Sequence, residues 1–136
     1  MTCVTLPNGV VTDYDYDSLN RLVYETITKT VSGVTTVLHT FEYTLNSDGN
    51  RNQVIEYVYN NDGSLNFSSQ TTWTYDALGR LLTEHYDEGQ NGWASGNDYV
   101  DTYTLDLVGN RIQKQHQTAA STTLPGRNPV YSHSNF

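Results

Sequence analysis

Aromatic and polar residues alternate strictly along several short stretches of the chain. Residues 13–17 read Asp-Tyr-Asp-Tyr-Asp, residues 41–44 read Phe-Glu-Tyr-Thr, and residues 72–75 read Thr-Trp-Thr-Tyr. A period of two puts one kind of side chain on each face of an extended strand and indicates half-buried antiparallel strands. A fourth stretch departs from the pattern, because Asp101 stands where an aromatic residue is expected. No sustained helical period occurs in residues 1–117, so we predict an all-β protein.

Turn signals separate the alternating stretches. Residues 7–9 (Pro-Asn-Gly), 31–33 (Val-Ser-Gly) and 61–63 (Asn-Asp-Gly) each lie between two strand-like runs, as in β-hairpins. Residues 88–97 form a longer loop with three glycines. The sequence therefore predicts an antiparallel β-hairpin meander of about eight strands. One face of such a sheet is poorly covered, so we expect a curved sheet, a partial shell or a barrel-like form, or pairing with a second copy.

Four segments resemble one another at intervals of about thirty residues. They are YDSLNR (16–21), YTLNSDGNR (43–51), YDALGR (75–80) and YTLDLVGNR (103–111), and their arginines fall at steps of 30, 29 and 31 residues. A shorter Tyr-Asp sub-type alternates with a longer one that closes on Gly-Asn-Arg, so the structural unit is expected to hold two segments. We predict positive φ in the turns at Gly49, Gly79 and Gly109, and at Asn20 in the first segment.

These segments resemble the tyrosine–aspartate (YD, or Rhs) repeat, whose core is Tyr-Asp, a short gap and Gly-Arg-Leu. The resemblance is carried by YDSLNRL and YDALGRL and covers roughly residues 5–115. It implies a piece of a large extracellular or cell-surface protein, in which strips of β-hairpins spiral into a hollow shell. In bacterial toxin complexes such a shell encloses a toxic domain, and in animal teneurins a similar shell belongs to an adhesion protein. Carbohydrate binding is also attributed to these repeats.

The organisation that follows is a repeat domain over residues 1–117 and a tail over residues 118–136. The tail is rich in serine, threonine and proline, and we expect it to be poorly ordered or to add one edge strand at residues 128–131. The start of the chain has no basic and apolar segment of the signal-peptide type. We expect an extracellular or cell-surface location within a longer parent protein, with other repeats or a second copy as partners through edge strands.

Composition narrows the function classes. The net charge is -8, with 15 acidic against 7 basic residues, which argues against nucleic acid and anionic membranes. No apolar run reaches membrane-spanning length, which argues against membrane insertion. The single cysteine, Cys3, excludes an intrachain disulfide. Hydrophobic residues make up 36% of the chain, with 11 tyrosines among them, which favours a partly wet interior or a broad sheet surface.

The chain shows no catalytic motif, and we expect neither an enzyme nor a cofactor. The Asp17–Arg21 and Asp76–Arg80 pairs span turns, where the carboxylate can accept backbone N–H groups and the arginine can bridge to it or stack on a tyrosine. A group that recurs in every unit is structural rather than catalytic. The aspartates of residues 13–17 are expected to form a solvated strand face rather than a cation site, and no histidine has metal-ligand spacing. The repeat-motif residues with this structural role are Tyr16, Asp17, Arg21, Tyr43, Gly49, Arg51, Tyr75, Asp76, Gly79, Arg80, Tyr103, Gly109 and Arg111.

The function expected first is a non-enzymatic structural module of a shell that encloses or displays another domain. The alternative is a carbohydrate-binding module that stacks sugar rings on exposed aromatic residues. The candidates for stacking are Trp93, Tyr99, Tyr57 and Tyr86, within a wider aromatic set that includes Tyr24 and Tyr59. The same rings could instead pair with one another across strands, which is the commoner use of aromatic residues in sheets.

Overall fold

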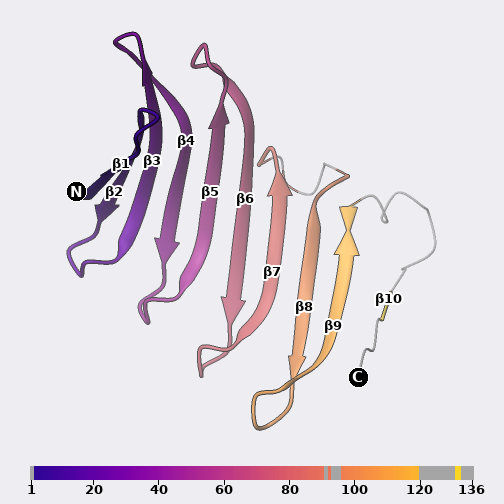
Figure 1. Ribbon diagram of the computed structural model, residues 1–136. Coiled ribbons are helices and arrows are strands. Elements are labelled where there is room, and N and C mark those ends of the chain that lie inside the picture. The colour runs from indigo at the N-terminus through magenta and orange to yellow at the C-terminus, as the bar shows by residue number, and fades with distance from the viewer. Residues whose placement is uncertain (1, 91, 93–95, 120–130, 133–136) are drawn as a thin grey trace. The chain divides into compact units, whose positions relative to one another are not determined.

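The computed structural model describes residues 2–90, 92, 96–119 and 131–132. Within these residues the chain is all-β, without an α-helix (Figure 1). The strands are β1 (Thr2–Thr5), β2 (Val10–Tyr16), β3 (Leu22–Val31), β4 (Val34–Leu45), β5 (Arg51–Tyr59), β6 (Leu65–Tyr75), β7 (Leu81–Glu88), β8 (Tyr99–Leu105), β9 (Arg111–Thr118) and β10 (Tyr131–Ser132). In this part of the chain no helix is long and apolar enough to cross a membrane.

The strands form one antiparallel meander in which their order in the sheet is their order in the chain. Because β1 and β10 stand at the two ends of that order, the sheet is not closed into a barrel. The predicted all-β hairpin meander is confirmed; β9 lies beyond the eight predicted strands, and β10 begins at the last residue of the predicted edge segment. Strand β10 pairs Tyr131 and Ser132 with His116 and Gln115 of β9, and most of the predicted edge segment lies outside the described residues.

The chain divides into two compact units, Met1–Ser69 and Gln70–Phe136, and the boundary falls within β6. The first unit holds the hairpins formed by β1 to β5, and the second holds those formed by β7 to β10. Each unit therefore contains one segment of the shorter repeat sub-type and one of the longer.

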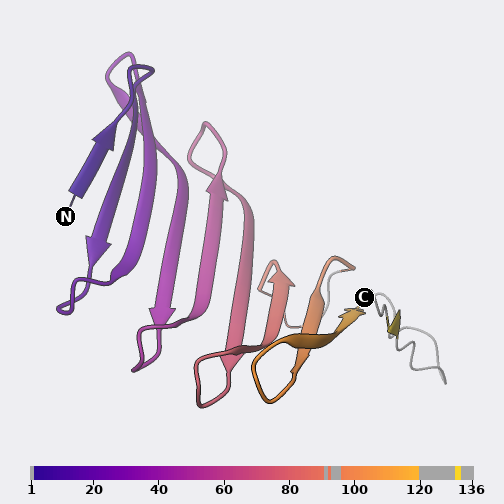
Figure 2. The same ribbon diagram turned by 60° about the horizontal axis from the view of Figure 1, so that its bottom comes forward.

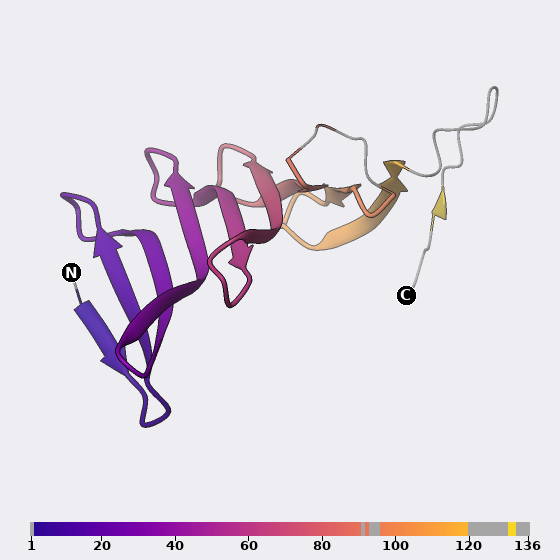
Figure 3. The same cartoon turned by 90° about the horizontal axis from the view of Figure 1, so that it is seen from above.

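Almost no apolar residue in the described part of the chain is buried. Among the described residues, Ala119 is the only apolar residue that is nearly inaccessible to solvent, at 7% exposure. Within each unit the strands form a single layer (Figure 3). Such a sheet is stabilised by backbone ladders and by side-chain pairs across strands, and less by the hydrophobic effect than a sheet packed against a second layer.

One face of the first unit carries a row of stacked rings along β4. The rings of His39 and Phe41 lie 6.0 Å apart, those of Phe41 and Tyr43 lie 6.3 Å apart, and both pairs are nearly parallel. The Arg51 guanidinium continues the row, 4.1 Å above the Tyr43 ring. The corresponding pair of the second unit is looser, because Arg111 lies 5.4 Å from the Tyr103 ring. We call this side of each unit the ladder face.

The shorter distance in the first unit predicts a stronger interaction energy between the arginine and the tyrosine there than in the second unit. We expect a coupling of about 0.5–1 kcal/mol between Tyr43 and Arg51, because a cation over an exposed ring contributes that much. The matched pair of Tyr103 and Arg111 should couple more weakly. Both energies are measured by double-mutant cycles in urea, with Tyr→Leu and Arg→Gln changes. Equal couplings in the two units would contradict the assignment.

Candidate functional site

Among the described residues, six turns share the same two backbone hydrogen bonds. In four of them the side chain of the first residue also accepts backbone N–H groups, and we call these four the motif turns; they begin at Asp17, Asn46, Asp76 and Asp106. In the first, the Asp17 N–H donates to the Arg21 carbonyl (2.9 Å) and the Asn20 N–H donates to the Asp17 carbonyl (3.0 Å). The other three repeat both hydrogen bonds at 2.9–3.1 Å. The fourth residue of each turn has positive φ, from 61° at Asn20 to 97° at Gly109, as predicted. Within each unit the motif turns lie at the same end of the strands (Figure 2).

The side chain of the first residue closes each motif turn from inside. Asp17 Oδ1 accepts the backbone N–H groups of Leu19 and Arg21, both at 2.9 Å. The side-chain oxygens of Asn46, Asp76 and Asp106 accept the equivalent two groups at 2.8–3.1 Å. The bond from the Arg21 N–H is the main cause that lowers the pKa of Asp17, and the Arg80 N–H lowers the pKa of Asp76 in the same way. For Asp106 the side chain of Asn110 is the main cause of a lowered pKa.

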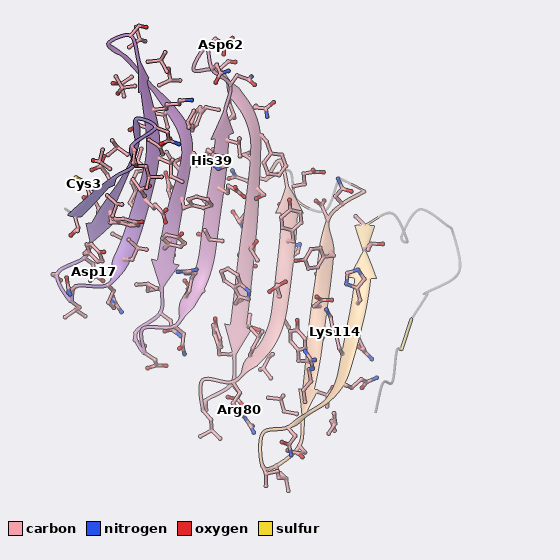
Figure 4. All side chains as sticks on the ribbon, viewed as in Figure 1. Cys3, Asp17, His39, Asp62, Arg80 and Lys114 are labelled. Atoms are coloured by element: carbon pink, nitrogen blue, oxygen red, sulfur yellow. The ribbon has the colours of Figure 1, made fainter. Side chains whose placement is uncertain are left out.

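The arginine of the shorter sub-type links one motif turn to the next. Arg21 Nε donates to Asp17 Oδ2 at 2.7 Å, and its Nη1 donates to the Asn46 carbonyl at 3.1 Å. Arg80 makes the same two bonds, to Asp76 Oδ2 at 2.6 Å and to the Asp106 carbonyl at 3.3 Å. Asp17 and Arg80 are labelled in Figure 4. Since the arginine bonds the first residue of the following turn, it fixes the spacing between successive hairpins.

The arginine of the longer sub-type has a different role. Arg51 and Arg111 stand one position later in their turns than Arg21 and Arg80, because Asn50 and Asn110 occupy the fifth turn position. One step along a strand reverses the side-chain direction. Arg51 and Arg111 accordingly lie over tyrosine rings of the ladder face. The first residues of the motif turns are spaced by 29, 30 and 30 residues. The repeat is therefore more regular when it is counted from turn to turn than when it is counted from arginine to arginine.

A row of polar residues crosses the ladder face of the second unit. Asp101 on β8 is aligned with Glu84 on β7 and with His116 on β9. The matching row of the first unit has Phe41 between Glu25 and Glu56. The change from Phe to Asp is thus accompanied by a change from Glu to His beside it, and Lys114 replaces Val54 one pair further along.

Asp101 is the centre of the row in the second unit. Its side chain is 6% exposed and binds Lys114 Nζ at 2.8 Å and His116 Nδ1 at 2.6 Å. The bond to Asp101 is the main cause that raises the pKa of Lys114. Glu84 accepts hydrogen bonds from the Tyr99 hydroxyl at 2.8 Å and from Trp73 Nε1 at 2.9 Å. The charge that replaces an aromatic ring is therefore compensated by two basic neighbours.

The row has one arrangement that also occurs in general bases, a carboxylate bonded to an imidazole. Within the described part of the chain, Asp101 is the only hydrogen-bond partner of the His116 imidazole, so no nucleophile is placed against it. Burial is the main cause that raises the pKa of Tyr99, and its bond to Glu84 adds to this. The bonds of the row link β7, β8 and β9, as cross-strand side-chain pairs that stabilise a sheet do.

The structure describes three of the four residues predicted to stack sugars. Tyr86 and Tyr99 stack on each other on the ladder face of the second unit, with centroids 5.3 Å apart. Tyr57 belongs to the first unit, opposite Thr40. Trp93 lies outside the described residues.

Metal-ligating groups do not gather in the described part of the chain. Asp13 and Asp15 lie on β2, and Asp17 binds Arg21. Within the described ranges, no group of three or more His, Cys, Asp or Glu residues is placed to hold a metal ion.

The row around Asp101 was not predicted from the sequence, although the break in alternation at that residue marked its position.

Comparison with known proteins finds no family model that matches the chain and no curated protein that matches it.

The motif turns make stability depend on pH in acid. A carboxyl group whose pKa is lowered by folding stabilises the fold above its ordinary pKa of about 3.9, and this contribution is lost as pH falls through the lowered value. We therefore expect the urea midpoint to fall between about pH 4 and pH 2. Asp76→Asn keeps the accepting oxygen without the titration, so its midpoint should fall less steeply. Asn46→Asp adds a titrating group in the same geometry and should fall more steeply; identical pH profiles for all three proteins would refute this account.

We expect that substitutions can convert the polar row around Asp101 in the second unit into the row around Phe41 in the first. Asp101→Phe alone leaves Lys114 and His116 without their partner, and we expect a loss of about 1–3 kcal/mol in the free energy of unfolding. Both basic side chains are about half exposed, so solvent screening limits the loss. Asp101→Phe with Lys114→Val and His116→Glu recreates the row of the first unit and should regain at least half of it. Chemical denaturation measures both, and a triple variant no more stable than the single one would show that the rows are independent of these pairs.

Proposed function

We propose that the chain is a non-enzymatic structural segment of a YD-type (Rhs-type) repeat protein. In this proposal it forms part of the wall of an extracellular or cell-surface shell, and the shell encloses or displays another domain of a longer parent. The observation that carries the proposal is the motif turn, in which the side-chain oxygen of the first residue accepts two backbone N–H groups, and which occurs four times at intervals of 29 or 30 residues.

The residues that define the repeat are occupied by the fold itself. Asp17 and Asp76 bind backbone N–H groups and an arginine, and Arg21 and Arg80 bind the next turn. Polar side chains that are saturated by their own turn are poor candidates for substrate chemistry. Their recurrence supports a role in setting the pitch of a strip of hairpins.

The shortage of buried apolar residues among the described residues supports the proposal that this sheet is part of a larger assembly. A single-layer sheet has two solvated faces and two edges, and unpaired backbone groups at an edge favour the addition of another strand. Strand β1 is exposed along its length and is the first in the order of strands. We propose that further repeats of the parent, or a second copy, continue the sheet through such edges.

The test uses the native polypeptide from the cells that make it, captured with an antibody against this segment. We expect a polypeptide much longer than 136 residues, with further Tyr-Asp segments and a neighbouring domain that proteases cleave only after denaturation. Asp76→Ala with Arg80→Ala in the parent should open the wall and expose that domain. Leu107→Ala is the matched control, because its side chain is fully exposed in a motif turn and bonds nothing there. A mature polypeptide no longer than this chain, or equal cleavage in all variants, would overturn the proposal.

A further inference from the structure

A hollow of about 430 Å³ lies on the ladder face of the second unit, beside its motif turns. The volume is within the range of small-molecule sites. Leu81 and Leu105 supply apolar wall, and Gly109 belongs to the motif turn that begins at Asp106. The polar lining residues are Arg80, which is labelled in Figure 4, Tyr103 and Arg111. The hollow therefore joins an apolar surface to two guanidinium groups and a phenol.

One of the three polar side chains is bonded within the chain, and the other two keep donors available. Arg80 donates to Asp76 Oδ2 and to the Asp106 carbonyl. In the described part of the chain, the Tyr103 hydroxyl has no hydrogen-bond partner, and Arg111 makes neither a side-chain hydrogen bond nor an ion pair. The contact of Arg111 with the Tyr103 ring, at 5.4 Å, does not satisfy the N–H groups of the guanidinium, which are five donors in one plane.

The first unit has the same residue types at the equivalent positions but a closed arrangement. There Arg51 lies 4.1 Å from the Tyr43 ring, and the Tyr43 hydroxyl donates to Glu25 at 3.5 Å. The ring of the longer sub-type is thus occupied on its face and at its hydroxyl. The six equivalent residues are Arg21, Leu22, Tyr43, Leu45, Gly49 and Arg51.

A different use of one glutamate opens the second unit. Glu84 is the counterpart of Glu25, because each is aligned with the middle residue of its row. One oxygen of Glu84 accepts the Tyr99 hydroxyl and the other accepts Trp73 Nε1. The Tyr103 hydroxyl therefore lacks the acceptor that its equivalent has in the first unit.

The basic groups around the hollow differ in their partners. Arg80 binds the Asp76 carboxylate, and Lys114 binds the Asp101 carboxylate. Within the described residues Arg111 has no such partner. A guanidinium matches a carboxylate in shape and can bond both of its oxygens at once. An unpaired guanidinium beside an apolar wall thus favours a ligand that has a carboxylate at one end and an apolar group at the other.

We propose that this hollow binds a small carboxylate that carries an aliphatic group. Arg111 bonds both carboxylate oxygens, the Tyr103 hydroxyl donates to one of them, and the aliphatic group lies against Leu81 and Leu105. Burial is the main cause that raises the pKa of Tyr103, so its phenol keeps its proton at neutral pH. The net charge of -8 opposes anions at long range, and we therefore expect millimolar affinity. The proposal goes beyond the structural role and does not depend on it, since the hollow lies within one unit.

The test is saturation-transfer NMR on the intact chain, with isovalerate as the probe and isovaleramide as its neutral match. We expect transfer to the isovalerate methyl protons at millimolar concentration. The amide should bind at least about tenfold more weakly, because a hydrogen bond to a charged group is stronger than one between neutral groups. Inorganic phosphate at the same concentration should not displace isovalerate, since it has no apolar group to fill the hollow. Displacement by phosphate, or equal binding of the amide, would contradict the proposed ligand class.

Variants place the site. Arg111→Gln should weaken isovalerate binding at least about tenfold, and Tyr103→Phe about threefold. Arg51→Gln is the matched control, because it makes the same change at the equivalent position of the first unit, and it should bind as the unmodified chain does. Circular dichroism checks the fold of each variant. If Arg111→Gln unfolds, Arg111→Lys replaces it and should weaken binding at least about threefold, because lysine keeps the charge without the planar pair of donors.

Three results overturn the proposal: no transfer to isovalerate, unchanged binding in the folded Arg111 variant, or an equal loss in Arg51→Gln. None of them bears on the role of the motif turns, because Asp17, Asp76 and their arginine partners are unchanged in every variant.

Discussion

The structure depends on one interaction, in which a side-chain oxygen accepts the two inward-pointing N–H groups of its own turn. Asp17, Asn46, Asp76 and Asp106 all make it. Without this acceptor, two backbone N–H groups of the tight turn would have only water to bond. With it, the turn forms at a defined residue, and the pairing of the two flanking strands is fixed. The hydrogen bond from Arg21 or Arg80 to the following motif turn then fixes the distance between two neighbouring hairpins.

Such a sheet has little hydrophobic core, so its polar side chains must be compatible with one another across strands. The two rows of the ladder face show this constraint. Phe41 stands between two glutamates in the first unit, whereas Asp101 stands beside His116 and Lys114 in the second. The substitution of one member is matched by its neighbours, as expected where cross-strand pairs are the unit of stabilisation.

Much of the fold could be predicted from the sequence, because alternation and turn chemistry are local properties. Strand β9 was not evident, since its residues, Arg-Ile-Gln-Lys-Gln-His-Gln-Thr, are polar on both faces. The four arginines looked equivalent in sequence, but a shift of one position in the turn sends Arg51 and Arg111 to the ladder face. The bulge between β3 and β4 could not be predicted either, because a bulge changes the strand pairing without changing the hydrophobic pattern.

The central claim is that turns and cross-strand polar pairs, rather than a buried apolar core, hold this fold together. Calorimetry of the intact chain tests it through the heat-capacity change of unfolding, which rises with the apolar surface that unfolding exposes. Globular domains give about 12–15 cal/mol/K per residue. We expect a cooperative transition with a value below about 10 cal/mol/K per residue. A value in the ordinary globular range would contradict the claim, because it would require a larger buried apolar core than the described residues show.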